Sequence, residues 1–255
     1  MNFDITMTAT IRPEIFEKSL KSIMGNIIEY NNKFNFRLII NIDPIGETNN
    51  FNQETIEEIT KKYHKNSVFV KPNQPDFPTA IKNIWNLVES DFMMHTEDDR
   101  IFMREVDLED IINKFDSNTG ICWIQGKLNR LSKFGFKVSK INDYWSINDD
   151  KKDPKCLLTM HPCIYRREML KDLVKYVRKG ASPEKVLRLQ DTSQLNNSEV
   201  QQLKNIINNW EFIVYSNHNS GYSKDIGREW KENMGFSKNR TGRLSSVKST
   251  WIKNR

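Results

Sequence analysis

The first hundred residues alternate between two hydrophobic periodicities, and this alternation restricts the possible folds more than any other feature of the chain. Short apolar runs of strand type are followed by stretches whose apolar residues recur at helical spacing. Because the connections are short, the pattern predicts an α/β fold with a mixed, mostly parallel sheet flanked by helices. The expected strands are 3–10, 36–42, 67–71 and 92–96, and the expected helices begin at Pro13, at Gln53 and, with Thr79 as its cap, at Ala80.

The second half is less regular, and it shows neither an internal repeat nor a low-complexity linker. We therefore expect a single domain over residues 1–255. Apolar periodicity, caps and stop signals predict helices at 108–115 and 166–179, a helical piece from Ser182, and strands at 121–125 and 212–215.

Composition excludes several classes of protein. No apolar stretch reaches the roughly 18 residues of a membrane span, and the N-terminus lacks the charged and apolar regions of a signal peptide. The three cysteines have no Cys-x-x-Cys spacing, so a reduced, cytoplasmic protein is expected.

The net charge of +6 is unevenly distributed. Residues 238–255 contain six Lys or Arg and no acidic residue. Such a basic segment favours a polyanionic partner, either nucleic acid, an anionic membrane or a diphosphate substrate, although it also fits a solubilising terminus.

Polar residues follow the predicted strands at the points where they end, at Thr10, Asp43, Pro72 and Glu97–Asp99. In parallel sheets, ligands bind beyond the carboxyl ends of the strands. Four polar strand ends are therefore expected to meet at one ligand-binding edge.

The acidic triplet Glu97-Asp98-Asp99 is the most informative of these strand ends. Three adjacent carboxylates repel one another by about 1 kcal/mol per contact in water, and by more where water is excluded. The apolar runs on both sides indicate that the triplet has buried roots, which requires a cation nearby. Mg²⁺ and Mn²⁺ bind carboxylates and phosphates together, so the triplet predicts a metal–diphosphate platform, with a solvated acidic turn as the alternative.

Together, the order and spacing of these motifs resemble the GT-A glycosyltransferases. The matching segments are Thr-Ala-Thr-Ile-Arg-Pro, Ile-Asp-Pro, Thr-Ala-Ile-Lys-Asn, Glu-Asp-Asp-Arg-Ile-Phe and, near the end, His-Asn-Ser-Gly followed by Asp-Ile-Gly-Arg-Glu-Trp. The resemblance implies a nucleoside-diphosphate sugar as donor, UDP being the favoured nucleotide, with Mn²⁺ or Mg²⁺ on the diphosphate. It also divides the chain into a nucleotide-sugar-binding half (1–103), an acceptor-binding half (104–237) and a basic C-terminal tail (238–255).

The resemblance implies roles for particular residues around the donor. Thr10 and Arg12 would contact the base or phosphate, and Asp43 would accept from the base or ribose. Lys82 and Asn83 would face the sugar nucleotide from their helix. Each position also has a plain structural explanation: a helix start for Arg12, a proline turn for Asp43 and a solvated helix face for Lys82.

The same resemblance implies metal ligands. Asp99 is the first candidate and Asp98 the second, while Glu97 would meet the ribose or sugar. The motif Glu-Asp-Asp differs from the family's common Asp-x-Asp motif. It therefore does not decide which of the three carboxylates bind the metal directly. His218 matches a late histidine ligand of some members and would favour Mn²⁺, since imidazole suits Mn²⁺ better than Mg²⁺; a structural histidine is the alternative.

An inverting enzyme would need a carboxylate base for the acceptor hydroxyl, and Glu184 and Asp191 lie in the matching region, although either also suits capping or solubility. His161 fits an acceptor pocket or a packed core.

The basic tail and the resemblance to small phage and viral enzymes make hydroxymethylated or glycosylated DNA bases the expected acceptor. The alternatives are a glycosyltransferase for a surface glycan, a non-catalytic nucleic-acid-binding protein, and a metal-dependent nuclease or nucleotidyltransferase using Asp98 and Asp99.

Overall fold

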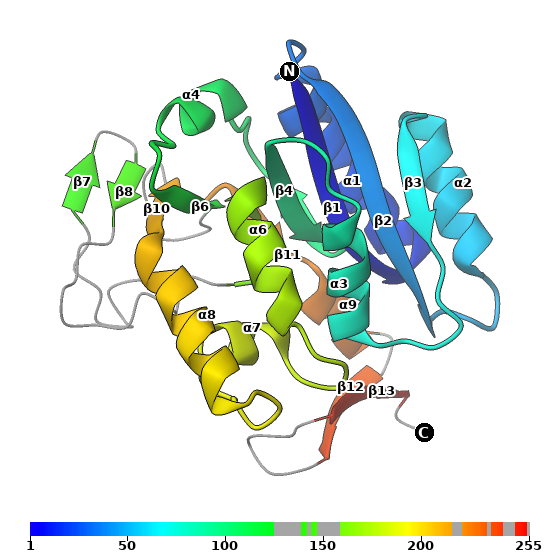
Figure 1. The fold of residues 1–255 in the computed structure, drawn as a ribbon. Helices are drawn as coiled ribbons and strands as arrows, with labels where there is room; N and C mark the ends of the chain where they lie inside the picture. Colours follow the sequence, from blue (N-terminus) through cyan, green and yellow to red (C-terminus); the bar gives the residue numbers. More distant parts are fainter. Residues whose placement is uncertain are drawn as a thin grey trace.

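The described residues form a nine-stranded sheet with helices on both faces (Figure 1). The strand order is β3-β2-β1-β4-β9-β6-β10-β8-β7. The computed structural model describes the backbone of residues 1–124, 139–141, 144–146, 159–215, 221–233, 236–241 and 248–253, and the side chains of 1–124, 159–215 and 221–233.

The first four strands of the sheet pair in parallel, as the sequence predicts. They are β1 (Asn2–Ile11), β2 (Asn35–Gly46), β3 (Ser67–Val70) and β4 (Phe92–Glu97), and the helices between them are α1 (Pro13–Ile23), which continues as a π-helical turn (Met24–Glu29), α2 (Gln53–Tyr63) and α3 (Phe77–Asn86). The cap of α3 differs from the prediction. Asp76 accepts the N–H of Thr79 at 3.1 Å, which places Pro78 in the first helical turn, where proline is well tolerated.

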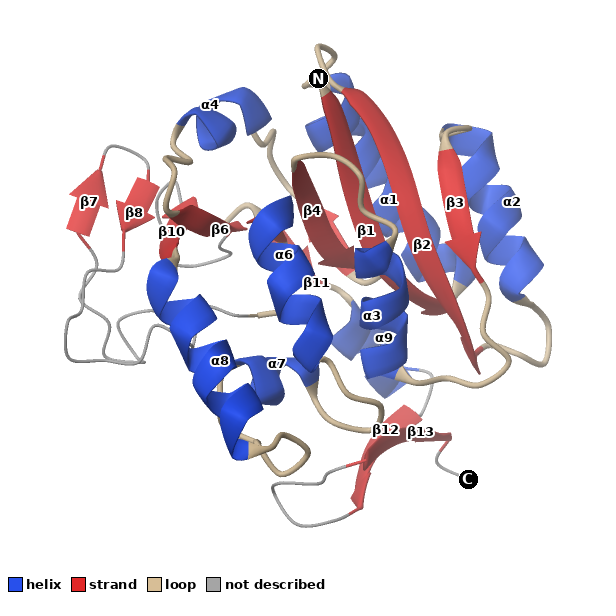
Figure 2. Cartoon of the chain, in the orientation of Figure 1, coloured by secondary structure: helices blue, strands red, loops and turns tan. Residues whose placement is uncertain are grey.

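Alternation along β1 separates the two faces of the sheet. Phe3, Ile5 and Met7 belong to the apolar cluster beneath α1 and α2, whereas Thr6 and Thr8 face the layer of α3. Helices α1 and α2 thus cover one face, and α3, α6 and α8 cover the other (Figure 2).

Strand β2 is longer than the sequence predicts, because it continues through Pro44 to Gly46. The register places Thr10 opposite Asp43 but Ile11 opposite Gly46, so two extra residues of β2 bulge outward. Proline is tolerated at such a bulge because the bulged residue makes no ladder hydrogen bond. The bulge holds Asp43 at the sheet edge rather than in a turn beyond it.

The second half adds a reversed strand that periodicity cannot reveal. Strand β9 (Cys163–Arg166) runs antiparallel to both β4 and β6 (Thr119–Ile124), so β6 and its parallel neighbour β10 (Glu211–Tyr215) regain the direction of the first four strands. The remaining elements are β5 (Arg100–Phe102), α4 (Leu108–Asn113), β7 (Ser139–Ile141), β8 (Tyr144–Ser146), α6 (Arg167–Leu173), a 3₁₀ turn (Val174–Tyr176), α7 (Pro183–Leu187) and α8 (Asn197–Asn209).

Helix α8 is absent from the sequence prediction. Asn196 and Glu199 form a reciprocal capping box at its start, which was the available signal, and Leu203 and Ile207 form its buried stripe. The predicted helix over 166–179 is shorter and ends in the 3₁₀ turn well before Gly180.

Two small sheets complete the fold. Strand β11 (Ser223–Asp225) pairs antiparallel with β5, and α9 (Gly227–Asn233) follows it. The segment expected as a basic tail includes an antiparallel hairpin of β12 (Phe236–Thr241) and β13 (Lys248–Lys253) (Figure 1). Within the described ranges, no helix has the length and hydropathy needed to cross a membrane.

Candidate active site

Three of the four predicted strand ends, those at Thr10, Asp43 and Asp98, meet at the carboxyl edge of the parallel strands. Thr10 lies opposite Asp43 in the β1–β2 register, and the N–H of Asp98 donates to the carbonyl oxygen of Thr8 at 3.0 Å. Asp98 also lies near enough to Asp43 to affect its pKa. The ends of β2, β1 and β4 therefore form one acidic edge.

Asp98 has its main counter-charge within the protein, although burial outweighs it and raises the pKa of Asp98. One of its carboxylate oxygens accepts from the N–H and hydroxyl of Thr10 at 2.9 and 3.1 Å, and the other pairs with the guanidinium of Arg12. Arg12 is only 2% exposed, so it is not a surface residue at a helix start. Burial alone would lower the pKa of Arg12, but Asp98 and Asp99 outweigh burial and raise it. The cation that the acidic triplet requires is, in part, Arg12.

Compared with Asp98, Asp99 has a weaker ion pair with Arg12 but is more closely packed by neighbouring residues. Its carboxylate lies 3.4 Å from Arg12, and its backbone oxygen accepts from the N–H of Ile226 at 2.9 Å. Gly227 packs directly on the side chain, since a Cβ there would stand 2.0 Å from Asp99 Oδ2. Arg12 in turn lies over the ring of Trp230 in α9, at 5.2 Å. The closing segment thus fixes the position of Asp99.

Glu97 has a strongly raised pKa. Burial and then the charge of Asp99 raise its pKa to about 8, against the opposing effect of Arg100, and Glu184 adds to the rise. Its side chain is nevertheless 27% exposed, and Arg100 lies 3.5 Å away. The raised pKa of Glu97 therefore reflects burial first and the neighbouring negative charges second, and Arg100 offsets them only in part.

Asp43 is also buried with incomplete compensation. Burial raises its pKa to about 6, Asp76 and Asp98 contribute further, and the amide of Asn41 opposes the rise by donating at 2.8 Å. Asp76 is the cap of α3, so the start of this helix lies beside the end of β2. Asn41 and Asp43 are therefore buried polar residues beneath this part of the acidic edge.

A pocket of about 380 Å³ opens on the other side of the triplet. It is lined by Arg100, His161, Asp225 and Arg228. Arg100 donates to Nδ1 of His161 at 2.7 Å, which makes Nδ1 an acceptor and places the proton of the neutral ring on Nε2. The ring of His161 also stacks on Trp123.

The two candidate bases occupy different surroundings. Glu184 accepts from the Thr159 hydroxyl at 3.0 Å and from the Met160 N–H at 2.8 Å, and thereby holds the segment that leads into His161. Its influence on the pKa of Glu97 places it near the triplet. Asp191 is 7% exposed and accepts from Ser193, and no described contact joins it to the acidic edge.

No described contact joins Lys82 or Asn83 to the acidic edge. Lys82 is exposed on α3, beside the half-buried Asn83, and the buried face of that helix is formed by other residues. His218 lies outside the described residues. Among the described residues, no group of three or more His, Cys, Asp or Glu side chains is arranged to hold a metal ion alone.

Sequence reasoning missed the contributions of Arg100, Asp225 and Gly227 to this site, whereas Arg228 was expected, with Trp230 and Lys231, to follow a phosphate backbone. The motif Asp-Ile-Gly-Arg-Glu-Trp was noticed as a resemblance, but its pairing with the strand after the acidic triplet was not predicted. Only the fold brings residues 99 and 227 into contact.

Comparison with known proteins establishes the fold. No family model and no curated protein matches the chain. Solved structures do match, and they define the class: the chain has the fold of the GT-A glycosyltransferases.

The particular neighbours include S. aureus TarS 1–349, with a TM-score of 0.56 and 14% identity over 92% of this chain and 63% of that one. The same fragment in complex with UDP-GlcNAc gives a TM-score of 0.54 and 15% identity over 87% of this chain and 58% of that one. CMP:2-keto-3-deoxy-manno-octonic acid synthetase complexed with CTP gives a TM-score of 0.51 and 10% identity, over 91% of this chain and 97% of that one. The chain spans less than two-thirds of the TarS fragment, and at these identities the likeness concerns the fold alone.

Proposed function

We propose that the protein is a glycosyltransferase that moves a sugar from a nucleoside-diphosphate sugar to a hydroxyl acceptor. The observation that carries this proposal is the acidic edge, where Asp43, Asp98 and Asp99 meet at the ends of adjacent parallel strands. This is the position where sheets of this type bind ligands. The fold shared with the UDP-GlcNAc complex of TarS supports it.

The donor would lie over the ends of β2 and β1. Asp43 would accept a hydrogen bond from the base or ribose, and Thr10 would line the path to the diphosphate. We propose UDP as the nucleotide. Arg12 is committed to Asp98, so in our proposal it orients the acidic motif rather than reaching the phosphates as the resemblance implied.

A divalent ion, Mn²⁺ or Mg²⁺, fits the residues at this edge. Glu97, Asp98 and Asp99 place three carboxylates at this edge, against the two neighbouring guanidinium groups of Arg12 and Arg100. Such ions are usually held by one or two carboxylates together with substrate phosphates, so a larger protein cage is not required. Asp99 would be the principal ligand, with Asp98 and His218 as further candidates. When bound, the ion neutralises charge on the departing diphosphate.

Glu184 is the proposed base if the enzyme inverts the anomeric centre. Glu184→Gln should lower the transfer rate by about 100-fold or more with little change in nucleotide affinity, because the amide oxygen can still accept from Thr159 and Met160. Asp191→Asn is the matched control, and we expect it to retain transfer. Equal rates in the two variants would exclude Glu184 as the base.

For the acceptor, we propose a hydroxymethylated or already glycosylated base in DNA, which the basic segment 238–255 supports by its charge. Deleting this segment should weaken DNA binding and flatten its salt dependence. A glycosyltransferase for a surface glycan would show neither effect.

The first experiment is thermal stability against a panel of nucleoside diphosphates, triphosphates and sugar nucleotides, with and without Mn²⁺. A ligand at a hundred times its dissociation constant stabilises by about 2.7 kcal/mol, which is readily measured. A metal-dependent shift with one diphosphate sugar supports the transferase. A shift confined to a triphosphate, with release of pyrophosphate on turnover, would favour a nucleotidyltransferase instead, an alternative favoured by the likeness to the CTP-bound synthetase.

A further inference from the structure

The pocket formed by Arg100, His161, Asp225 and Arg228 lies on the far side of the acidic triplet from Asp43. Across the edge of the sheet the order is β2, β1, β4 and β9, and His161 stands just before β9. A donor lying over β2 and β1 would therefore end at Glu97–Asp99, with this pocket directly beyond it. Its position makes it the acceptor side of the site.

The charges on the pocket wall are unequal. Arg100 is shared between Glu97, at 3.5 Å, and Asp225, at 3.7 Å, and it also donates to His161. The other oxygen of Asp225 accepts the N–H groups of Gly227 and Arg228 at the start of α9. The carboxylate of Asp225 is therefore already engaged by Arg100 and by the start of α9.

Arg228 is the cation that remains. Its side chain is exposed, and within the described part of the chain no ion pair or side-chain hydrogen bond engages it. The Nε of Arg100 is buried and makes no hydrogen bond within the described residues, although it is the atom that lies 3.5 Å from Glu97. A guanidinium in these circumstances suits a phosphate, which it binds through two parallel N–H donors.

The chain that follows Arg228 identifies the kind of phosphate. Helix α9 leads within a few residues into the β12–β13 hairpin, and Figure 1 shows the hairpin beyond the end of that helix. Residues 238–255 carry six Lys or Arg and no acidic residue. A single phosphate needs no such extended positive segment, whereas a phosphodiester backbone does.

We propose that this pocket binds a backbone phosphate of a nucleic-acid acceptor, with Arg228 as its principal contact. The proposal rests on the transferase function above and adds the acceptor's recognition group to it. The phosphate would position the acceptor strand, and the target hydroxyl would be presented to the acidic edge. Phosphate contacts fix register and orientation without reading sequence.

The test measures the affinity of the full chain for a short fluorescein-labelled DNA duplex between about 50 and about 200 mM salt. Arg228→Ala should weaken binding about tenfold at the lower salt, as expected for the loss of a charged hydrogen bond. It should also reduce the slope of log affinity against log salt by about one. Since Arg228 is exposed, the variant is expected to remain folded, which its melting temperature checks.

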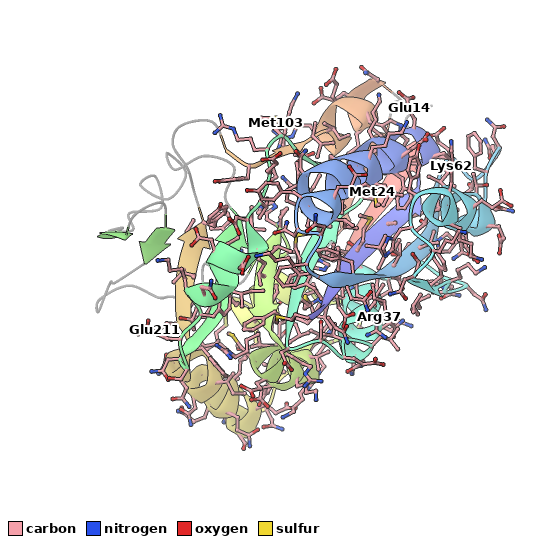
Figure 3. The ribbon with its side chains drawn as sticks, turned by 90° about the horizontal axis from the view of Figure 1, so that it is seen from above. Glu14, Met24, Arg37, Lys62, Met103 and Glu211 are labelled. Carbon is pink, nitrogen blue, oxygen red and sulfur yellow. The ribbon has the colours of Figure 1, made fainter. Side chains whose placement is uncertain are left out.

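Lys62→Ala is the matched control, because it removes one positive charge from α2, at the β3 edge of the sheet (Figure 3). We expect its affinity and salt slope to equal those of the wild type. UDP affinity, measured in parallel with Mn²⁺, should be the same in all three proteins.

Three outcomes would overturn the proposal. Equal duplex binding by the two variants would show that Arg228 contacts no backbone phosphate. A loss of UDP affinity in Arg228→Ala would assign the pocket to the donor. Absence of duplex binding by the wild type, with its UDP response intact, would exclude a nucleic-acid acceptor while leaving the transferase standing. Failure of the transferase itself would appear separately, as no response to any nucleotide.

Discussion

The two halves of the site are built in different ways. The donor side uses consecutive parallel strands, and its polar residues stand where those strands end, at Thr10, Asp43 and Asp98. The acceptor side uses segments far apart in the chain. Arg100 meets Asp225 through the β5–β11 pairing, and His161 lies just before the antiparallel strand β9.

This difference separates residues that local rules position from residues that only the complete fold positions. A parallel sheet brings its strand ends to one edge whatever the loops contain. The acceptor side instead depends on the reversed strand β9 and on the β5–β11 pairing, which joins residues more than a hundred positions apart. Asp99 is positioned in both ways, because it directly follows the end of β4 and its side chain is confined by the distant Gly227.

The largest effect is expected at Asp99, where the two systems meet. Asp99→Asn should lower transfer by about a thousandfold, since it removes the carboxylate that we assign to metal and diphosphate. Because Asp99 makes only a 3.4 Å contact with Arg12, we expect the free energy of unfolding to change by less than about 1 kcal/mol. Steady-state kinetics and urea unfolding check both expectations. Normal activity would remove Asp99 from the metal site.

At the adjacent Asp98 we expect the larger effect on the free energy of unfolding. Asp98→Asn leaves the buried guanidinium of Arg12 without its main counter-charge, and breaking a buried pair costs about 3 kcal/mol or more. Urea unfolding would measure this loss. A change no larger than that of Asp99→Asn would contradict the view that Asp98 is the main partner of Arg12 and Asp99 a weaker one.

The fold and the site were predictable from sequence to different extents. The parallel half was predicted closely, because its strands and helices carry clean periodicity and its connections are short. The reversal of β9 was not predicted, because an apolar run such as 163–166 has the same appearance in either direction. Helix α8 was missed although Asn196 and Glu199 mark its start.

The same division holds within the site. The convergence of Thr10, Asp43 and Asp98 follows from strand ends alone and is observed. The internal pairing of Arg12 with Asp98 does not follow, because the sequence shows a charged residue at a helix start and not its burial. The pocket beyond the triplet requires the β5–β11 pairing, for which residues 223–225 give no periodic signal.

A substitution at Gly227, on the acceptor side, is expected to displace the carboxylate of Asp99. In Gly227→Ala the new Cβ would stand 2.0 Å from Asp99 Oδ2, so the carboxylate must move. We expect a loss of transfer of about ten- to a hundredfold, as misplacement of catalytic groups by about 1 Å produces. Gly25→Ala is the matched control, because a Cβ there meets nothing within 4 Å. Equal activity of the two variants would show that Gly227 does not position Asp99.

The smallest effect is expected at Asp43, and it depends on pH. Burial raises its pKa to about 6 in the folded protein, above the value of 3.8 expected when it is exposed. The folded state therefore binds the proton more tightly than the unfolded state. The resulting stabilisation is complete below pH 4 and is lost as the pH rises through about 6.

Asp43→Asn removes this titration. At 1.36 kcal/mol per pKa unit the whole shift is worth up to about 3 kcal/mol, and we expect the neutral amide, itself buried and polar, to recover about half. Urea unfolding at several pH values should show a variant more stable than the wild type at pH 8 by about 1.5 kcal/mol, equal to it near pH 5 and less stable than it by about 1 kcal/mol at pH 4. The same substitution should weaken UDP binding, because Asp43 would be kept buried for the donor at the expense of stability. A pH-independent difference would mean that Asp43 is already neutralised in the folded protein, and the donor side would then lack the uncompensated charge that distinguishes it.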